Sequence, residues 1–226
     1  MFFKLLQSKK MKKTILPATF LLAGAILFSS CNNGVNDKSI NEMDSAAYKD
    51  STHAVKMRNA MMLSMSRTMD KMHDMKMTGD FDLDFANMMI SHHRAAIDMS
   101  ETEIVRGTNE QVKTMAKAII TAQNAEIGHL EAFIKSYQAP ATKMETAEMQ
   151  NMMRDMMDKM NNMELTGNTD KDFIMMMIPH HEGAIKMAEY ELTNGKQAEL
   201  KKMAQKMIAD QNKEISQFKA WLTNQK

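Results

Sequence analysis

Met88-Met89-Ile90-Ser91-His92-His93 recurs 88 residues further along the chain as Met176-Met177-Ile178-Pro179-His180-His181. The two stretches hold four of the seven histidines in the 226-residue sequence. Other residues repeat at the same spacing, among them Met61 and Met149, Phe85 and Phe173, Ile97 and Ile185, Glu103 and Glu191, and Ile127 and Ile215. A constant spacing without gaps is typical of an internal duplication. We therefore expect two tandem repeats of about 80 residues, at 57–137 and 145–225, joined by a linker at 138–142.

Each repeat is predicted to contain three helices. In the first repeat they are expected at about 55–76, 82–106 and 108–136, with breaks at Thr78-Gly79-Asp80 and Gly107. The second helix of the second repeat should end at Asn194-Gly195. No segment shows the alternation of a strand, so the expected fold is all-α, with the long helices of both repeats packed as an antiparallel bundle.

The N-terminus has the features of a lipoprotein leader. Lys9, Lys10, Lys12 and Lys13 precede an apolar run at 15–28, which ends shortly before Cys31. We expect residues 1–30 to be a signal peptide, Cys31 to be lipidated, residues 31–54 to be a flexible tether and 55–226 to be the folded domain. The alternative is an uncleaved membrane anchor, although the run is short for one. The lipoprotein hypothesis places the protein in the cell envelope, on the periplasmic face of a membrane.

The charge balance and the cysteine content bear on a nucleic-acid partner and on internal disulfide bonds. The chain has 29 basic and 28 acidic residues, a balance that gives no indication of a nucleic-acid partner. Cys31 is the only cysteine, so the domain has no internal disulfide bond.

The predicted second helix divides the two histidines of each motif. On a helical wheel, His92 shares an arc with Phe85, Met88 and Met99, whereas His93 points about 100° away, towards the flank. The same division applies to His180 and His181. A buried histidine is often satisfied by a carbonyl group, but two adjacent histidines duplicated with methionines favour a metal site, because imidazole and thioether groups are copper ligands.

The third helix places polar residues within its apolar stripe. These are Gln123 and Glu126 in the first repeat and Gln211 and Glu214 in the second. A buried carboxylate is costly unless it is paired or bound to a metal. The glutamates could bind a metal directly, accept a ring N–H from a histidine, or lie at the edge of the stripe.

Methionine is abundant, with 29 residues in the chain, and fills the first predicted helix of each repeat. A methionine stripe is commonly a packing feature. Thioethers are also soft ligands that form no disulfides, which favours Cu(I) or Ag(I) over zinc or magnesium. Auxiliary copper sites on these helices are therefore a second hypothesis, with His73 as a participant.

On the doubled His-His motif, the Asp-Phe pairs at 84–85 and 172–173 and the Gln-x-x-Glu-Ile stretches, the sequence resembles the DUF305 family over residues 55–225. The resemblance implies a ferritin-like helical bundle and a link to periplasmic copper binding and resistance. Pro179 should kink its helix before His180, whereas Ser91 stands where proline is common in the family. Carried over by position, the implied ligands are Met88, Met89, His92, His93 and Met99, with Met176, Met177, His180, His181 and Met187.

The expected function is therefore copper binding, as Cu(I) or Cu(II), by a chaperone, buffer or resistance factor of the cell envelope. Its partners would be the metal ion, the membrane through the lipid, a copper-trafficking protein and a second copy of the chain. Catalysis is not expected. Two alternatives are a di-iron oxidase, for which only Glu126 and His129 have the required spacing, and a structural helical lipoprotein without metal. Whether the two motifs form one site or two is left open by the sequence.

Overall fold

The computed structural model describes residues 61–63, 65, 74–140 and 147–225. All of them belong to one compact unit. The predicted leader at 1–30, the tether at 31–54 with Cys31, and the histidines at 53 and 73 lie outside the described residues. Within the described part, no helix combines the length and apolar character needed to span a membrane.

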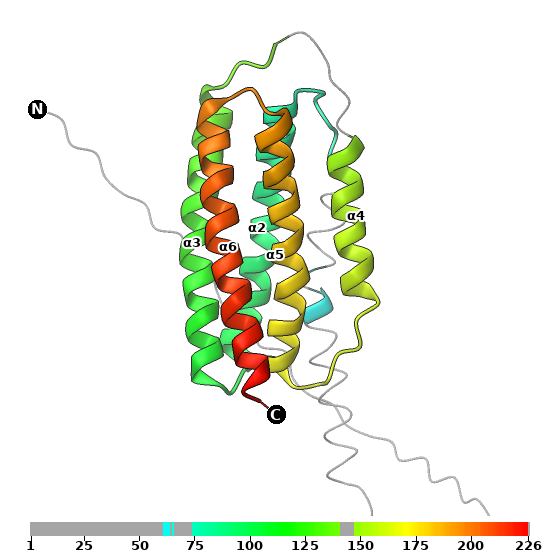
Figure 1. The fold of residues 1–226 in the computed structure, drawn as a ribbon, viewed down its shortest axis with the longest axis vertical. Coiled ribbons are helices and arrows are strands. Elements are labelled where there is room, and N and C mark those ends of the chain that lie inside the picture. The colour runs from blue at the N-terminus through cyan, green and yellow to red at the C-terminus, as the bar shows by residue number, and fades with distance from the viewer. Residues whose placement is uncertain (1–60, 64, 66–73, 141–146, 226) are drawn as a thin grey trace, which may run out of the picture. The chain divides into compact units, whose positions relative to one another are not determined.

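The described elements are helical, as the sequence predicts, and no strand occurs among them (Figure 1). Helix α2 spans Phe81–Arg106 and α3 spans Glu110–Ser136, and three residues join them. Helix α5 spans Thr169–Asn194 and α6 spans Ala198–Thr223, with a connection of the same length. Such short connections make α2 and α3, and likewise α5 and α6, antiparallel neighbours. The predicted all-α bundle is confirmed. Helices α2 and α3 begin and end within two residues of the ranges expected for them, and α5 ends at Asn194 as expected.

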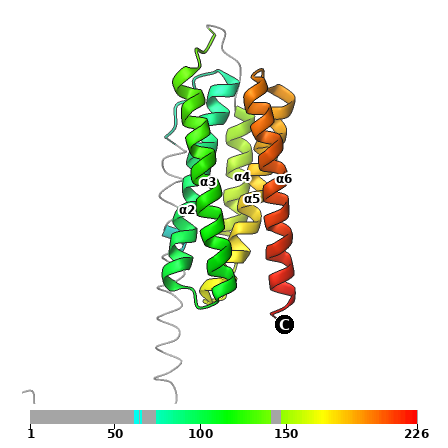
Figure 2. The same cartoon turned by 90° about the vertical axis from the view of Figure 1, so that its left-hand side faces the viewer.

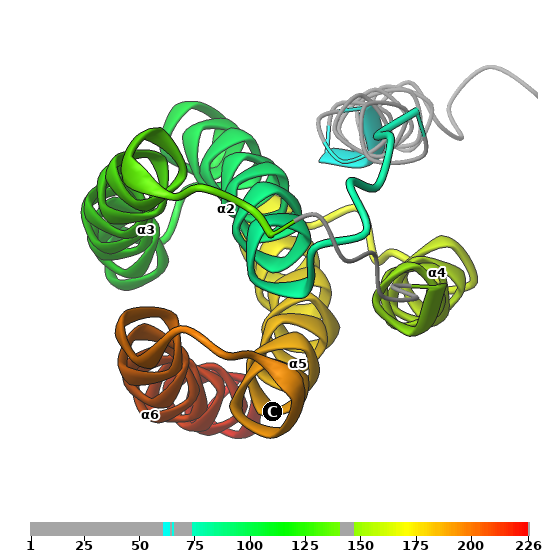
Figure 3. The ribbon, with the colours of Figure 1, turned by 90° about the horizontal axis from the view of Figure 1, so that it is seen from above.

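Helices α2 and α5 lie side by side at the centre of the unit. Each contacts the other, α2 also contacts α3, and α5 also contacts α6. Seen from above, the four helices follow one another in the order α3, α2, α5, α6 around an arc (Figure 3). The shorter helix α4, Ala147–Asn161, lies outside this arc and packs on α5. The motif-bearing helices are therefore the two that join the halves of the chain.

The segments that precede α2 and α5 have the same structure. The carboxylate of Asp84 accepts hydrogen bonds from the backbone N–H groups of Thr78, at 2.7 Å, and Gly79, at 3.0 Å. Gly79 has a φ of 82°, a left-handed conformation that glycine adopts without steric cost. These hydrogen bonds hold Thr78 and Gly79 in the turn before α2. Residues 75–79 are not helical, and the prediction that the first helix reaches residue 76 is wrong.

Helix α4 buries a face made of methionines. Met149, Met153, Met156, Met157 and Met160 are each at most 7% exposed. Met156 lies against the backbone of α5, where a β-carbon placed on Gly183 would come within 2.7 Å of its sulfur atom. Each buried methionine contributes roughly 1.5–3 kcal/mol of apolar burial. These methionines therefore have a packing role in the structure.

Candidate metal centre

His92 of α2 and His180 of α5 meet where the two helices cross at the centre of the unit. Their ring centroids are 3.7 Å apart, with the planes inclined by 38°. Each residue is 1% exposed. The Nε2 atom of His92 donates to the backbone carbonyl oxygen of His180 at 3.1 Å. The one-turn spacing of apolar residues around each histidine explains why both point into this contact.

The second histidine of each motif faces a glutamate on the neighbouring helix. The Nε2 atom of His93 lies 2.8 Å from Oε2 of Glu126 on α3. The Nε2 atom of His181 lies 2.7 Å from Oε2 of Glu214 on α6. His93 and His181 are fully buried rather than at the flank that the wheel indicates, because α3 and α6 cover that side of α2 and α5.

Burial determines the charge of the central histidines. It holds the pKa of His92 well below its ordinary value of 6.5, and the nearby His93 and His181 lower the pKa further. Burial lowers the pKa of His180 in the same way, with a further contribution from His92. Both rings are therefore neutral at pH 7, and the neutral imidazole is the form that binds a metal.

The methionines of the two motifs are buried in the core as well. The six methionines that the sequence identifies as ligands are all at most 3% exposed and belong to the core cluster that spans both halves: Met88, Met89, Met99, Met176, Met177 and Met187. Their sulfur atoms are thus enclosed in the same interior as the imidazoles. A buried thioether is a soft ligand that carries no charge into the core.

Several polar atoms of this interior have no hydrogen-bond partner among the described residues. They are Nδ1 of His92, His93, His180 and His181, Nε2 of His93 and His180, and the amide nitrogen and oxygen of Gln123 and Gln211. The two glutamines are each 3% exposed. Unpaired buried polar atoms are uncommon in folded proteins and each one calls for an explanation. Ring nitrogens with a free lone pair, enclosed with thioethers, fit a soft metal ion.

The acidic residues do not add a cluster of hard ligands. Among the described residues, no three side chains of histidine, cysteine, aspartate or glutamate converge closely enough to hold a metal ion. The groups brought together are pairs: His92 with His180, His93 with Glu126, and His181 with Glu214. His129, the histidine considered for a di-iron site, is exposed on α3.

Two buried carboxyl groups near the bundle ends were missed in the sequence analysis. Glu103, at the end of α2, is completely buried beside Asp170, at the start of α5. Burial, with a smaller contribution from a hydrogen bond to Asp170, raises the pKa of Glu103 to about 9. Burial and repulsion from Asp82 raise the pKa of Glu191 to about 9 in the equivalent position. Each glutamate therefore retains its proton at pH 7 and lies beside an aspartate of the other half of the chain.

The aspartates of these pairs hold the starts of the neighbouring helices. Asp170 accepts hydrogen bonds from the N–H groups of Thr108 and Asn109, at 3.0 and 2.8 Å, where α3 begins. Although burial opposes the effect, these hydrogen bonds keep the pKa of Asp170 below its ordinary value of 3.8. Asp82 accepts from Lys196 and Gln197 where α6 begins. The signal in the sequence was the repetition of Glu103 as Glu191, four residues after a core methionine.

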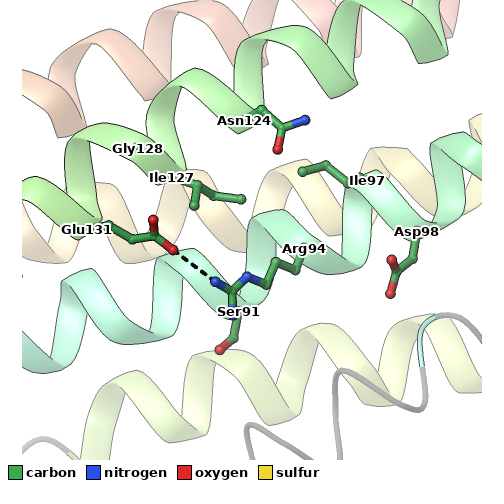
Figure 4. Close-up of a pocket in the computed structure, with 8 residues that line it drawn as sticks. All are labelled: Ser91, Arg94, Ile97, Asp98, Asn124, Ile127, Gly128 and Glu131. Carbon is green, nitrogen blue, oxygen red and sulfur yellow. Dashed lines mark hydrogen bonds and ion pairs between the residues drawn. The ribbon is translucent and has the colours of Figure 1, made fainter. Parts of the chain in front are cut away.

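A groove on the outer side of α2 and α3 is separate from the histidines. It encloses about 480 Å³ and is crossed by an ion pair between Arg94 and Glu131, at 2.9 Å (Figure 4). The equivalent pair on α5 and α6 is Glu182 with Lys219, at 4.0 Å, with the charges exchanged. Exposed pairs of this kind contribute little to stability.

Solved structures similar to this chain are known. CopM, solved in a Cu(I)-bound form, is 32% identical, with 63% of this chain and 96% of that chain covered and a TM-score of 0.48. A DUF305 fragment from Deinococcus radiodurans is 22% identical, with 64% and 96% covered and a TM-score of 0.50. A DUF305 protein from Streptomyces coelicolor is 22% identical, with 66% and 94% covered and a TM-score of 0.53. The last two share the helical fold of this chain.

A family model extends the comparison to the sequence. No curated protein matches the chain. The family described as a domain of unknown function, DUF305, matches residues 32–134, which include the first His-His motif, and residues 82–222, which include both motifs. The chain therefore belongs to the DUF305 family.

Proposed function

We propose that the protein binds copper as Cu(I) in the core between α2 and α5, and that it buffers or carries the metal without catalysing a reaction. The observation that carries the proposal is the set of four buried imidazoles with unpaired ring nitrogens, enclosed with six buried thioethers. This donor set is soft and uncharged, which favours Cu(I) and Ag(I) over zinc, magnesium or calcium.

The two motifs support a central site more directly than two distant ones. The rings of His92 and His180 come from different halves of the chain and lie in contact. Met88, Met99, Met176 and Met187 are the methionines one or two helical turns from these rings. Met89 and Met177 occupy the same relation to His93 and His181. Gln123 and Gln211 would supply neutral amide groups to the same interior.

The experiment is a competition titration of the purified protein with Cu(I) in the presence of a chromophoric Cu(I) chelator. Replacement of His92 and His180 together by alanine should abolish tight binding. His129→Gln is the matched control, because His129 is exposed on α3 and its equivalent on α6 is Gln217. Copper affinity that is equal in the double variant and in the control would refute the proposal.

We extend the proposal to the location of the protein. The basic and apolar residues before Cys31 support a leader at 1–30, lipidation of Cys31 and a tether at 31–54, which would hold the domain at the periplasmic face of a membrane. Metabolic labelling with a radioactive fatty acid should mark the protein, and Cys31→Ser should remove the label. Retention of the label in Cys31→Ser would contradict the assignment. A copper-trafficking protein and a second copy of the chain are the proposed partners.

A further inference from the structure

Three of the four buried imidazoles have the same ring nitrogen against an oxygen atom. Nε2 of His93 faces a carboxylate oxygen of Glu126 at 2.8 Å, and Nε2 of His181 faces one of Glu214 at 2.7 Å. Nε2 of His92 faces the carbonyl oxygen of His180 at 3.1 Å. The three contacts involve different helices and two kinds of oxygen, but each of them uses Nε2 and leaves Nδ1 without a partner. The contacts of His92 and His181 are hydrogen bonds, whereas His93 and Glu126 lie within ion-pair distance without the geometry of a hydrogen bond.

An oxygen at this distance determines which nitrogen carries the ring proton. A carbonyl group can only accept, so Nε2 of His92 must be the N–H donor. The side chains of Glu126 and Glu214 are 13% and 21% exposed, so water reaches each carboxyl group on its outer side. A carboxylate likewise accepts, and two lone pairs at 2.7–2.8 Å would repel each other.

The opposite arrangement of the proton is unfavourable in each case. A proton on Nδ1 would be a buried donor without an acceptor among the described residues, at a cost of about 1–3 kcal/mol. The hydrogen bonds of His92 and His181 therefore place a ring proton on Nε2, and the contact of His93 with Glu126 favours the same position. In all three rings Nδ1 is left without a partner among the described residues.

We propose that Nδ1 is the metal-binding atom of His92, His93 and His181, and that Glu126 and Glu214 are positioning residues rather than ligands. Each glutamate holds one ring in the tautomer and orientation that leaves Nδ1 free, which is the role that carboxylates often have behind metal-binding histidines. This inference rests on the proposed function and deepens it, since it distinguishes between the two roles that the sequence leaves open for the glutamates.

The first arm of the experiment needs no metal. The protein is labelled with 15N-histidine, treated with a chelator and studied by long-range 1H–15N correlation spectroscopy, which distinguishes the two tautomers. His92, His93 and His181 should show a proton on Nε2, and individual His→Gln variants assign the signals. A proton on Nδ1 of His93 and His181 would overturn the inference whether or not the protein binds copper.

The second arm adds Cu(I) to the same sample. The Nδ1 resonances of the three histidines should shift while Nε2 keeps its proton. A shift at Nε2 with loss of its proton would overturn the ligand assignment and leave copper binding intact. No copper-induced shift at any histidine would overturn both the proposed function and the assignment that rests on it.

The glutamates are tested by substitution. Glu126→Ala and Glu214→Ala should lower Cu(I) affinity about 10- to 100-fold and release the tautomer of the facing ring. Glu126→Gln and Glu214→Gln guard against misfolding, and should retain Nε2–H because the amide oxygen still accepts. Glu131→Ala is the control, since Glu131 is an exposed glutamate of α3. An unchanged tautomer and unchanged affinity in both alanine variants would overturn the positioning role.

Discussion

The imidazole rings of His92 and His180 lie 3.7 Å apart, centroid to centroid, in the contact between α2 and α5. A proton added to either ring would place a charge in the core next to another imidazole. Because burial and the neighbouring histidines lower both pKa values, the unfolded chain takes up protons at a higher pH than the folded chain does.

This relationship gives the protein a stability that is lost in acid. The histidine contribution should be fully present above pH 6.5, the ordinary histidine value, and should decline as the pH falls below it. Chemical denaturation between pH 7.5 and 5 should show a steeper loss for the wild-type protein than for His180→Gln. Parallel curves for the two proteins would contradict the explanation, and His129→Gln should follow the wild-type curve.

Glu103 and Glu191 should give the stability of the protein the opposite dependence on pH. Between pH 4.5, the ordinary value, and about 9, the unfolded chain has released a proton that the folded chain retains, so the free energy of unfolding falls as the pH rises. Glu103→Gln keeps the shape of the side chain and a donor towards Asp170. It should therefore stabilise the protein by about 1–3 kcal/mol at pH 7.

The measurement is thermal unfolding of Glu103→Gln and Glu191→Gln at pH 6, 7 and 8. The gain in Tm over the wild-type protein should increase with pH. Glu131→Gln, an exposed glutamate in an ion pair, should change the Tm little at any pH. A gain that does not depend on pH would mean that the carboxyl proton is not the cause.

The glycines that follow α2 and α5 are predicted to be sensitive to substitution, because there is no room for a β-carbon at either position. A β-carbon on Gly107 would lie 2.0 Å from Oε1 of Glu103, and one on Gly195 would lie 2.1 Å from Oε1 of Glu191. Because backbone oxygens lie only 2.7 Å away as well, movement of the glutamate alone cannot relieve the contact. Gly107→Ala and Gly195→Ala should each destabilise the protein by about 1–3 kcal/mol.

Gly128 supplies the matched control for these substitutions. It lies within α3, and a β-carbon there would meet nothing within 4 Å. Gly128→Ala should therefore stabilise the protein by about 0.5–1 kcal/mol through helix propensity. In urea denaturation, the free energy of unfolding should fall in Gly107→Ala and Gly195→Ala and rise in Gly128→Ala. Destabilisation by Gly128→Ala would contradict the spatial argument.

The outer ion pairs are predicted to be nearly neutral for stability. Arg94 and Glu131 have exposed side chains, so water and salt screen their attraction. A double-mutant cycle with Arg94→Ala and Glu131→Ala should give a coupling of about 0.2–1 kcal/mol that decreases with added salt. A coupling well above this range, insensitive to salt, would show that the groove of Figure 4 is less hydrated than the exposed side chains indicate.

The helical repeat pattern was enough to predict the helices, but it could not predict contacts between them. A wheel for an isolated helix places His93 at the flank of α2, and only the position of α3 explains why the residue is fully buried (Figure 2). Glu126 was recognised as inward-facing because its own helix has a clear apolar stripe. The partnership of Glu103 with Asp170 joins residues 67 positions apart at a bundle end, and no local pattern encodes it.

The helix starts of the two halves depend on each other. The start of α3 is held by Asp170, from the second half of the chain, and the start of α6 is held by Asp82, from the first half. A chain cut between residues 140 and 147 would leave each fragment without the acceptor for one of its own helices. Size-exclusion chromatography should then find each fragment expanded alone and compact when mixed with the other. Because each half supplies the acceptor for a helix of the other, we expect each half to be less stable alone than in the complete chain.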